Sequence, residues 1–314
     1  MRHVLLRAPS RLRYQHLFRP LPVLLLGAFV LTTLVRPSAL TAQPRKVYIS
    51  VDLEGISGIN GDDQTAAGRP EYARARKLMA EDANAAIRGA FEGGATEVIV
   101  NDSHGGQRNL LPEDLDPRVR LISHSFKRYG MMEGLDSTFD AVLFVGYHAK
   151  AGSPRGVFAH TGSGVLRDLR INGQSVGEGG MNAWMAKWFG VPVVLVTGDD
   201  VAIAEQRETV PAVRGVVVKR AINSRAVELR PLVETRREIQ EAAKAAVAGA
   251  RRTPPERTGP FTVRMELRDP TIPEVASAFQ EVKLVNPTTV EFTRASMPEA
   301  YRLIRVIYRF INTD

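Results

Sequence analysis

The chain has 314 residues, enough for one large domain or two modest ones with a packed core. Its formal net charge is +8, but six arginines lie within the first 42 positions, before the first acidic residue, Asp52. The remainder therefore carries 8 − 6 = +2, which excludes a strongly basic surface, and we expect no nucleic-acid partner. Because the chain has no cysteine, any metal must bind through oxygen and nitrogen atoms.

Residues 1–42 predict a signal peptide or a signal anchor. An arginine-rich start precedes the apolar run at 21–35, and the small residues Ala39 and Ala42 follow it. The run is short for a membrane-spanning helix, which needs roughly 20 apolar residues. We therefore expect cleavage after Ala42, with an uncleaved anchor at 21–35 as the alternative and no other membrane contact. In both cases the folded part is exported, to the periplasm or the extracellular space.

Residues 43–220 alternate between predicted strands and helices. A helix is expected at 70–94, and a second one at 179–190. A hairpin is expected at 168–176, with its turn at Asn172 and Gly173. The expected strands lie at 45–52, 95–102, 118–123, 139–147 and 191–200. This alternation predicts an α/β domain with a mostly parallel sheet flanked by helices.

Residues 221–314 have a different pattern and predict a C-terminal α+β segment or lobe. A helix rich in Ala, Glu and Arg is expected at 231–252, followed by a connector at 251–260. Three strands are then expected at 260–269, 281–286 and 288–294, and a final helix at 297–310. We expect a domain boundary near residue 220.

The first strand ends in two carboxylates, Asp52 and Glu54. Side chains two residues apart in a strand point the same way, roughly 6.6 Å apart along the strand. In α/β sheets, the carboxyl ends of the strands form the edge where ligands bind. Two like charges this close repel unless a cation lies beside them. The pair therefore indicates either a cation site or simply a solvated strand end.

Two histidines are expected at the same edge of the sheet. His104 follows the strand at 95–102, and His148 follows the strand at 139–147. Glu178 lies at the start of a predicted helix, where it could reach a metal or only complement the helix dipole. Asp52, Glu54, His104, His148 and Glu178 are too many ligands for one catalytic zinc, but they suit two metals if one carboxylate bridges.

Four further residues are candidates for supporting roles. His160, in a glycine-rich loop, is expected either to transfer a proton over the metal site or to be an ordinary surface histidine. Asp102 is expected to orient His104, and His124 is expected to be structural. Asp199 and Asp200 are candidates for docking a substrate amino group, with helix capping by Asp200 as the alternative.

Several collinear motifs resemble the DppA-type D-aminopeptidases, which are zinc-dependent, self-compartmentalising peptidases. The resemblance extends from about Lys46 to the C-terminus. It is carried by "VYISVDLEGISGI", "EVIVNDSHG", "MEGLDSTFDAVLFVGYHAKA", "INGQSVGEGGMNAW" and "VPVVLVTGDD".

The resemblance implies two zinc ions per subunit, with Asp52 bridging them. Glu54 and His104 would complete the ligands of one ion, and His148 and Glu178 those of the other. His160 would be the catalytic histidine. Short D-amino-acid peptides of the D-Ala-D-Ala type would be substrates, and the protein would form a homo-oligomer.

The expected reaction is hydrolysis of an amide bond by metal-activated water. One alternative is another dinuclear-metal hydrolase, an amidohydrolase or a phosphoesterase. We expect no Lys/Arg cluster near the ligand motifs to hold a phosphate, which disfavours the phosphoesterase. The other alternative is an exported metal-binding protein without catalytic activity.

Overall fold

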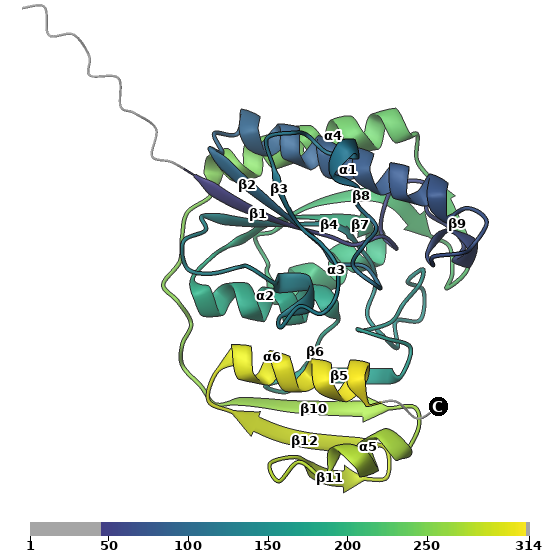
Figure 1. Ribbon diagram of the computed structural model, residues 1–314, viewed down its shortest axis with the longest axis vertical. Coiled ribbons are helices and arrows are strands. Elements are labelled where there is room, and N and C mark those ends of the chain that lie inside the picture. Colours follow the sequence, from purple (N-terminus) through teal and green to yellow (C-terminus); the bar gives the residue numbers. More distant parts are fainter. Residues whose placement is uncertain (1–44, 312–314) are drawn as a thin grey trace, which may run out of the picture. The chain divides into compact units, whose positions relative to one another are not determined.

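The computed structural model describes residues 45–311, which form two β-sheets and the helices packed on them (Figure 1). The leader predicted at 1–42 lies outside the described residues. Within 45–311, none of the helices combines the length and the hydrophobicity that crossing a bilayer requires.

The first sheet contains seven strands in the order β3-β2-β1-β4-β7-β8-β9. The first six of these run parallel, and only β9 is antiparallel to its neighbour β8. The bounds are β1 (Lys46–Val51), β2 (Glu97–Asp102), β3 (Arg120–Ile122), β4 (Ala141–Tyr147), β7 (Val193–Asp199), β8 (Arg214–Ala221) and β9 (Val227–Leu229).

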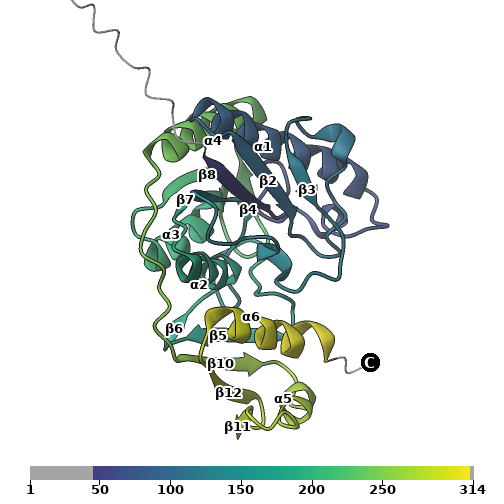
Figure 2. The same ribbon diagram turned by 60° about the vertical axis from the view of Figure 1, so that its left-hand side comes forward.

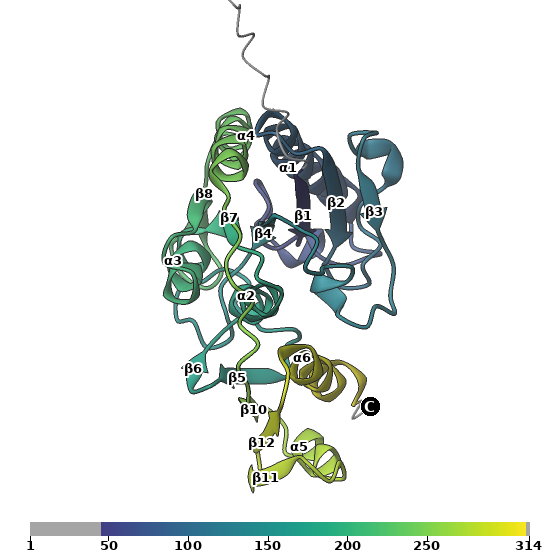
Figure 3. The same cartoon turned by 90° about the vertical axis from the view of Figure 1, so that its left-hand side faces the viewer.

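Helices cover both faces of this sheet. The helices α1 (Tyr72–Glu92) and α4 (Leu232–Gly249) lie on one face, and α2 (Glu178–Phe189) and α3 (Asp200–Thr209) lie on the other (Figure 3). Alternate residues of β1 enter the two cores: Ile49 packs in the α1/α4 core and Tyr48 in the α2 core. Burial on both faces explains why the parallel strands are continuous apolar runs. The predicted fold class is confirmed.

The second sheet is antiparallel, in the order β11-β12-β10-β5-β6. Its helix α6 (Met297–Arg305) continues as a π-helical turn, Val306–Phe310, and packs between this sheet and α2 (Figure 2). The remaining bounds are β5 (Leu166–Ile171), β6 (Gln174–Ser175), β10 (Phe261–Leu267), α5 (Thr271–Ala276), β11 (Lys283–Asn286) and β12 (Thr289–Arg294).

Chain segments from both sides of residue 220 contribute to each sheet layer. The early strand β5 pairs with β10, and the late helix α4 packs against α1. The boundary expected near residue 220 stays a prediction.

The strand order changes direction between β1 and β4. From β1 the chain proceeds outward to β2 and β3, and from β4 it proceeds outward on the other side to β7 and β8. In such sheets, ligands bind in the crevice beyond the carboxyl ends of the strands at this switch. The backbones approach closely there, because a Cβ atom on Gly55 would lie 2.0 Å from the carbonyl oxygen of Tyr147. Only glycine fits at that position.

Candidate metal centre

The structure brings together all five predicted ligands at the carboxyl edge of the first sheet. Asp52 and Glu54 follow β1, His104 follows β2, His148 follows β4, and Glu178 is the first residue of α2. All five are buried. Their donor atoms form two groups, each within 4.8 Å, and Asp52 belongs to both groups.

The first group consists of Asp52, Glu54 and His104. His104 Nδ1 lies 2.9 Å from Glu54 Oε2 and 3.4 Å from Asp52 Oδ1. His104 Nε2 lies 2.6 Å from the carbonyl oxygen of Thr65, which accepts a hydrogen bond from it. With its proton on Nε2, the ring presents the lone pair of Nδ1 to the carboxylates, as a metal-binding histidine must.

The second group consists of Asp52, His148 and Glu178. His148 Nε2 lies 3.4 Å from Asp52 Oδ2 and 3.3 Å from Glu178 Oε2. His148 Nδ1 donates to the carbonyl oxygen of Ala149 at 2.9 Å, which leaves Nε2 free to ligate. In both groups, therefore, one ring nitrogen of the histidine binds a backbone carbonyl and the other faces the carboxylates.

Two buried polar atoms of this centre have no hydrogen-bond partner within the described residues. They are Asp52 Oδ2 and His148 Nε2, which face each other. Buried polar atoms without partners are costly, and most native ones are satisfied by protein, water or an ion. Oxygen and nitrogen atoms in this arrangement fit a divalent cation such as zinc.

The charges of the centre are strongly coupled. Burial and the neighbouring charge of Glu54 raise the pKa of Asp52 to about 8. Burial alone would also raise the pKa of Glu178, but the charge of His148 lowers it to about 2. Burial would lower the pKa of His148, and the charge of Glu178 instead raises it well above its usual value. Without a bound cation, protons held by these side chains supply the positive charge that balances the carboxylates of the centre.

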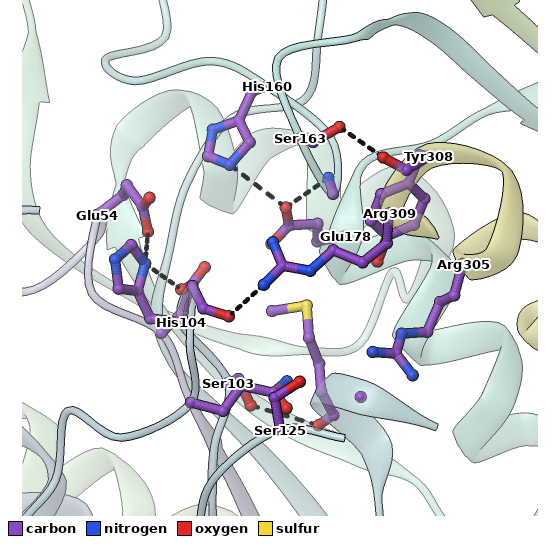
Figure 4. Close-up of a pocket in the computed structure, with 16 residues that line it drawn as sticks. Glu54, Ser103, His104, Ser125, His160, Ser163, Glu178, Arg305, Tyr308 and Arg309 are labelled. Carbon is purple, nitrogen blue, oxygen red and sulfur yellow. Dashed lines mark hydrogen bonds and ion pairs between the residues drawn. The ribbon is translucent and has the colours of Figure 1, made fainter. Parts of the chain in front are cut away.

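His160 lies in the loop between β4 and β5, over the second group (Figure 4). Its Nε2 is 3.6 Å from Glu178 Oε1, and its ring stacks on that of His148 with the centroids 4.1 Å apart. Its Nδ1 donates to the carbonyl oxygen of Phe158 at 2.7 Å. The side chain retains 27% exposure, so that His160 can meet a ligand.

Asp102 does not orient His104, and that prediction was wrong. Its carboxylate accepts hydrogen bonds from the backbone N–H groups of Asn109 and Leu110 and from the Asn109 amide. The Asn109 amide also donates to the backbone carbonyl of His104. Asp102 therefore shapes the loop that carries His104, while the Thr65 carbonyl contacts the ring.

The predicted roles of the Asp199–Asp200 pair also need correction. Asp199, not Asp200, caps α3, and its carboxylate accepts from the N–H groups of Val201 and Ala202. Asp200 instead accepts from the N–H of Ala221. Neither acid lines the cavity at the metal centre, so the structure gives them no contact with a substrate there. His124 is exposed and lies outside that cavity.

A cavity of about 220 Å³ opens beside the predicted ligands (Figure 4). One wall contains Asp52, Glu54, His104 and Glu178. The other wall comes from α6 and the π-helical turn and includes Arg305, Tyr308 and Arg309.

The expectation of no Lys/Arg cluster was therefore wrong. The arginines are distant from the ligand motifs in sequence, and their spacing in an amphipathic helix is also typical of solvent-exposed residues. No sequence signal distinguished them.

Comparisons with known proteins show the family of this chain. The sequence model of a peptidase family described as D-aminopeptidase matches residues 45–306. A D-aminopeptidase of Bacillus subtilis (strain 168) is 39% identical over 267 residues, covering 83% of this chain and 96% of that protein.

A solved structure is also similar, with a TM-score of 0.81 and 37% sequence identity. It is described as the Zn-dependent D-aminopeptidase DppA from Bacillus subtilis, a self-compartmentalizing protease. The match covers 86% of this chain and 99% of that chain. The family and enzyme class predicted from the sequence are confirmed: the chain belongs to the D-aminopeptidase family.

Proposed function

We propose that this D-aminopeptidase is an exported enzyme that binds two zinc ions and removes N-terminal D-amino acids from short peptides such as D-Ala-D-Ala. The observation that carries the proposal is the pair of buried ligand groups that share Asp52. The zinc-dependent relative of similar structure supports the choice of metal.

The residues present fit two zinc ions. Each group would supply three protein residues, the usual number at a catalytic zinc, because Asp52 belongs to both groups. When bound, zinc acidifies water and polarises the scissile carbonyl. The unpartnered atoms Asp52 Oδ2 and His148 Nε2 would both gain a partner.

His160 would move the proton that the reaction requires. In amide hydrolysis, water adds a hydroxyl to the carbonyl carbon, the C–N bond breaks, and the departing nitrogen takes up a proton. The hydrogen bond to the Phe158 carbonyl fixes the ring so that Nε2 faces the cavity wall beside Glu178. From there His160 could deliver the proton or stabilise the oxyanion. Direct attack by His160 is the less natural role beside a metal-activated water.

Export and assembly complete the proposal. The sequence of residues 1–42 supports a signal peptide, which would place the enzyme where D-peptides from cell-wall turnover occur. The relative described as self-compartmentalizing supports a homo-oligomer.

The proposal is tested by metal analysis of the purified protein, together with a panel of D- and L-dipeptides. We expect two zinc ions per chain and cleavage that requires an N-terminal D-residue. The variant His160→Ala should retain its zinc and lose turnover by at least about 100-fold. The control His124→Asn, at an exposed residue with φ 73°, should retain both.

Wild-type turnover in the zinc-loaded His160→Ala variant would contradict the role of His160. Arg305 and Arg309 on the cavity wall also suit a phosphate, so the panel includes p-nitrophenyl phosphate. Phosphatase turnover without dipeptide cleavage would favour the phosphoesterase alternative.

A further inference from the structure

We propose that Arg305, with Arg309 beside it, binds the free C-terminal carboxylate of the substrate and thereby selects short peptides with an unblocked C-terminus. This inference rests on the proposed function, because it assumes that a peptide occupies the cavity. It assigns a role to the cavity wall opposite the metal centre.

Arg305 is a buried cation that is held in place by backbone groups. The residue is 5% exposed, and its Nη1 donates to the carbonyl oxygens of Lys127 and Arg128. Its guanidinium packs against Gly130, where a Cβ atom would lie 2.6 Å from Nε. The position of the positive charge is therefore fixed before any ligand binds.

This fixed charge lacks an acidic partner within residues 45–311. Neither Arg305 nor Arg309 takes part in an ion pair there, whereas Arg155, Arg170 and Arg236 each pair with an acid. The hydrogen bonds of Arg305 Nη1 run to backbone carbonyls, and the guanidinium carbon lies 5.9 Å from the ring centroids of Phe126 and Phe310, so its neighbours there are neutral groups. A guanidinium remains charged at all accessible pH values, and a buried unpaired charge is destabilising.

The unpaired charge faces the cavity that contains the metal centre (Figure 4). Arg309 is more exposed, and its Nη2 donates to the carbonyl oxygen of Gly105 at 3.1 Å, on the loop after His104. An anion bound in the cavity would contact both guanidinium groups. Among the described residues, no carboxylate of the centre forms an ion pair with either arginine, and Glu54 and Glu178 instead lie beside His104 and His148.

The anion that every unblocked peptide carries is its C-terminal carboxylate. Arginine binds a carboxylate through two parallel N–H···O bonds, which fixes orientation as well as distance. The volume of about 220 Å³ is below the roughly 300–1,000 Å³ of pockets for drug-sized ligands. A peptide bound by its carbonyl at the metal centre and by its carboxylate at Arg305 must therefore be short.

The test compares D-Ala-D-Ala with D-alanyl-D-alaninamide, in which a neutral amide replaces the carboxylate. For the wild-type holoenzyme, kcat/KM on the acid should exceed that on the amide by at least about 30-fold. Arg305→Met should bring this ratio close to one, mainly by raising KM for the acid. Arg305→Lys should restore part of the ratio, because the charge returns without the planar fork.

A matched control is Arg302→Met, at an exposed arginine of the same helix that does not line the cavity, and it should retain the wild-type ratio. Binding is measured separately by calorimetry on the zinc-loaded His160→Ala variant. Adding Arg305→Met to this variant should lower its affinity for the acid by at least about 30-fold and leave its affinity for the amide unchanged.

Two results would overturn the inference and leave the proposed function intact. One is equal wild-type turnover of acid and amide, and the other is an equal loss on both substrates in Arg305→Met. A zinc-loaded wild-type protein that cleaves neither substrate nor any other D-peptide would instead contradict the proposed function.

Discussion

Asp52 is the residue on which both ligand groups depend. Burial and the charge of Glu54 raise its pKa to about 8, and the pKa values of His104 and His148 also lie well above their usual range because acids surround them. The metal-free centre therefore holds more protons in the folded state than in the unfolded state near neutral pH.

This excess of protons predicts how stability depends on pH without metal. A group whose pKa is raised by folding loses its contribution as pH rises from its unfolded pKa through its folded pKa. Between pH 6.5 and 8 the unfolded state has released these protons and the folded state has not. Raising the pH across this window should therefore lower the Tm of the metal-free protein.

Zinc should reverse this trend, because it binds only to the deprotonated ligands. Thermal unfolding with a chelator and with excess zinc checks both expectations. The zinc-induced rise in Tm should grow from pH 6.5 to 8. The window ends there because burial lowers the pKa of Lys127 and Lys219 to about 8, which has the opposite effect at higher pH. If the Tm of the metal-free protein instead rises from pH 6.5 to 8, the raised pKa values of Asp52, His104 and His148 would be contradicted.

At the residue scale, the sequence contained strong information about the ligands and weak information about their supports. The five predicted ligands lie at strand or helix ends, where the topology of a parallel sheet fixes their position. The support for His104 comes from the backbone carbonyl of Thr65, and any residue type supplies a carbonyl. Asp102 was therefore a plausible wrong choice.

At the scale of elements, β8 is fastened to the loop that follows β1. Lys219 of β8 is fully buried, and its ammonium donates to the carbonyl oxygens of Glu54, Ile56 and Ile59. These contacts hold the turn that carries Glu54 into the metal centre. Lys219 is thus a positioning residue that acts on the backbone of a predicted ligand.

Replacing Lys219 by methionine should weaken metal binding. The change removes the donor of the buried carbonyls of Glu54 and Ile59 and leaves the Ile56 carbonyl with the N–H of Ile59, which should cost about 2 to 3 kcal/mol of stability. We expect zinc affinity to fall about 10- to 100-fold, as for other supports of metal ligands. Competition titration with a zinc chelator measures the affinity. Lys283→Met, at an exposed lysine of β11, is the control, and unchanged affinity in Lys219→Met would exclude the positioning role.

Lys219 also shows why some elements were not predicted. The strand β8 has the sequence RGVVVKRA, in which charged residues flank a run of only three valines. Tertiary contacts offset the cost of burying its lysine, and the local sequence does not reveal these contacts. Likewise, α3 begins directly at the end of β7, whereas the strand was expected to extend to residue 200, with helix capping by Asp200 as an alternative. The long apolar strands β1, β4 and β7 were predicted because both of their faces are covered.

At the scale of the whole molecule, the proposed export predicts a processed chain. If the leader is cleaved after Ala42, the mature protein begins at Gln43 and is found outside the cytoplasmic membrane. Intact-mass spectrometry of the protein from fractionated cells checks this. A full-length chain in the membrane fraction would support the anchor, and a full-length chain in the cytoplasm would contradict export.

The two sheets divide the chemistry between them. All five predicted ligands belong to the first sheet and its helices, whereas Arg305 belongs to the helix of the second sheet. The loop that carries His160 connects the two, because it leaves β4 and enters β5. If Arg305 binds the substrate carboxylate as proposed, substitutions in the C-terminal layer should change which peptides are accepted and leave the predicted ligands and His160 unchanged. By this route, relatives would come to differ in the peptides that they cleave. A chimera in which residues 261–311 come from a relative should show the peptide preference of that relative.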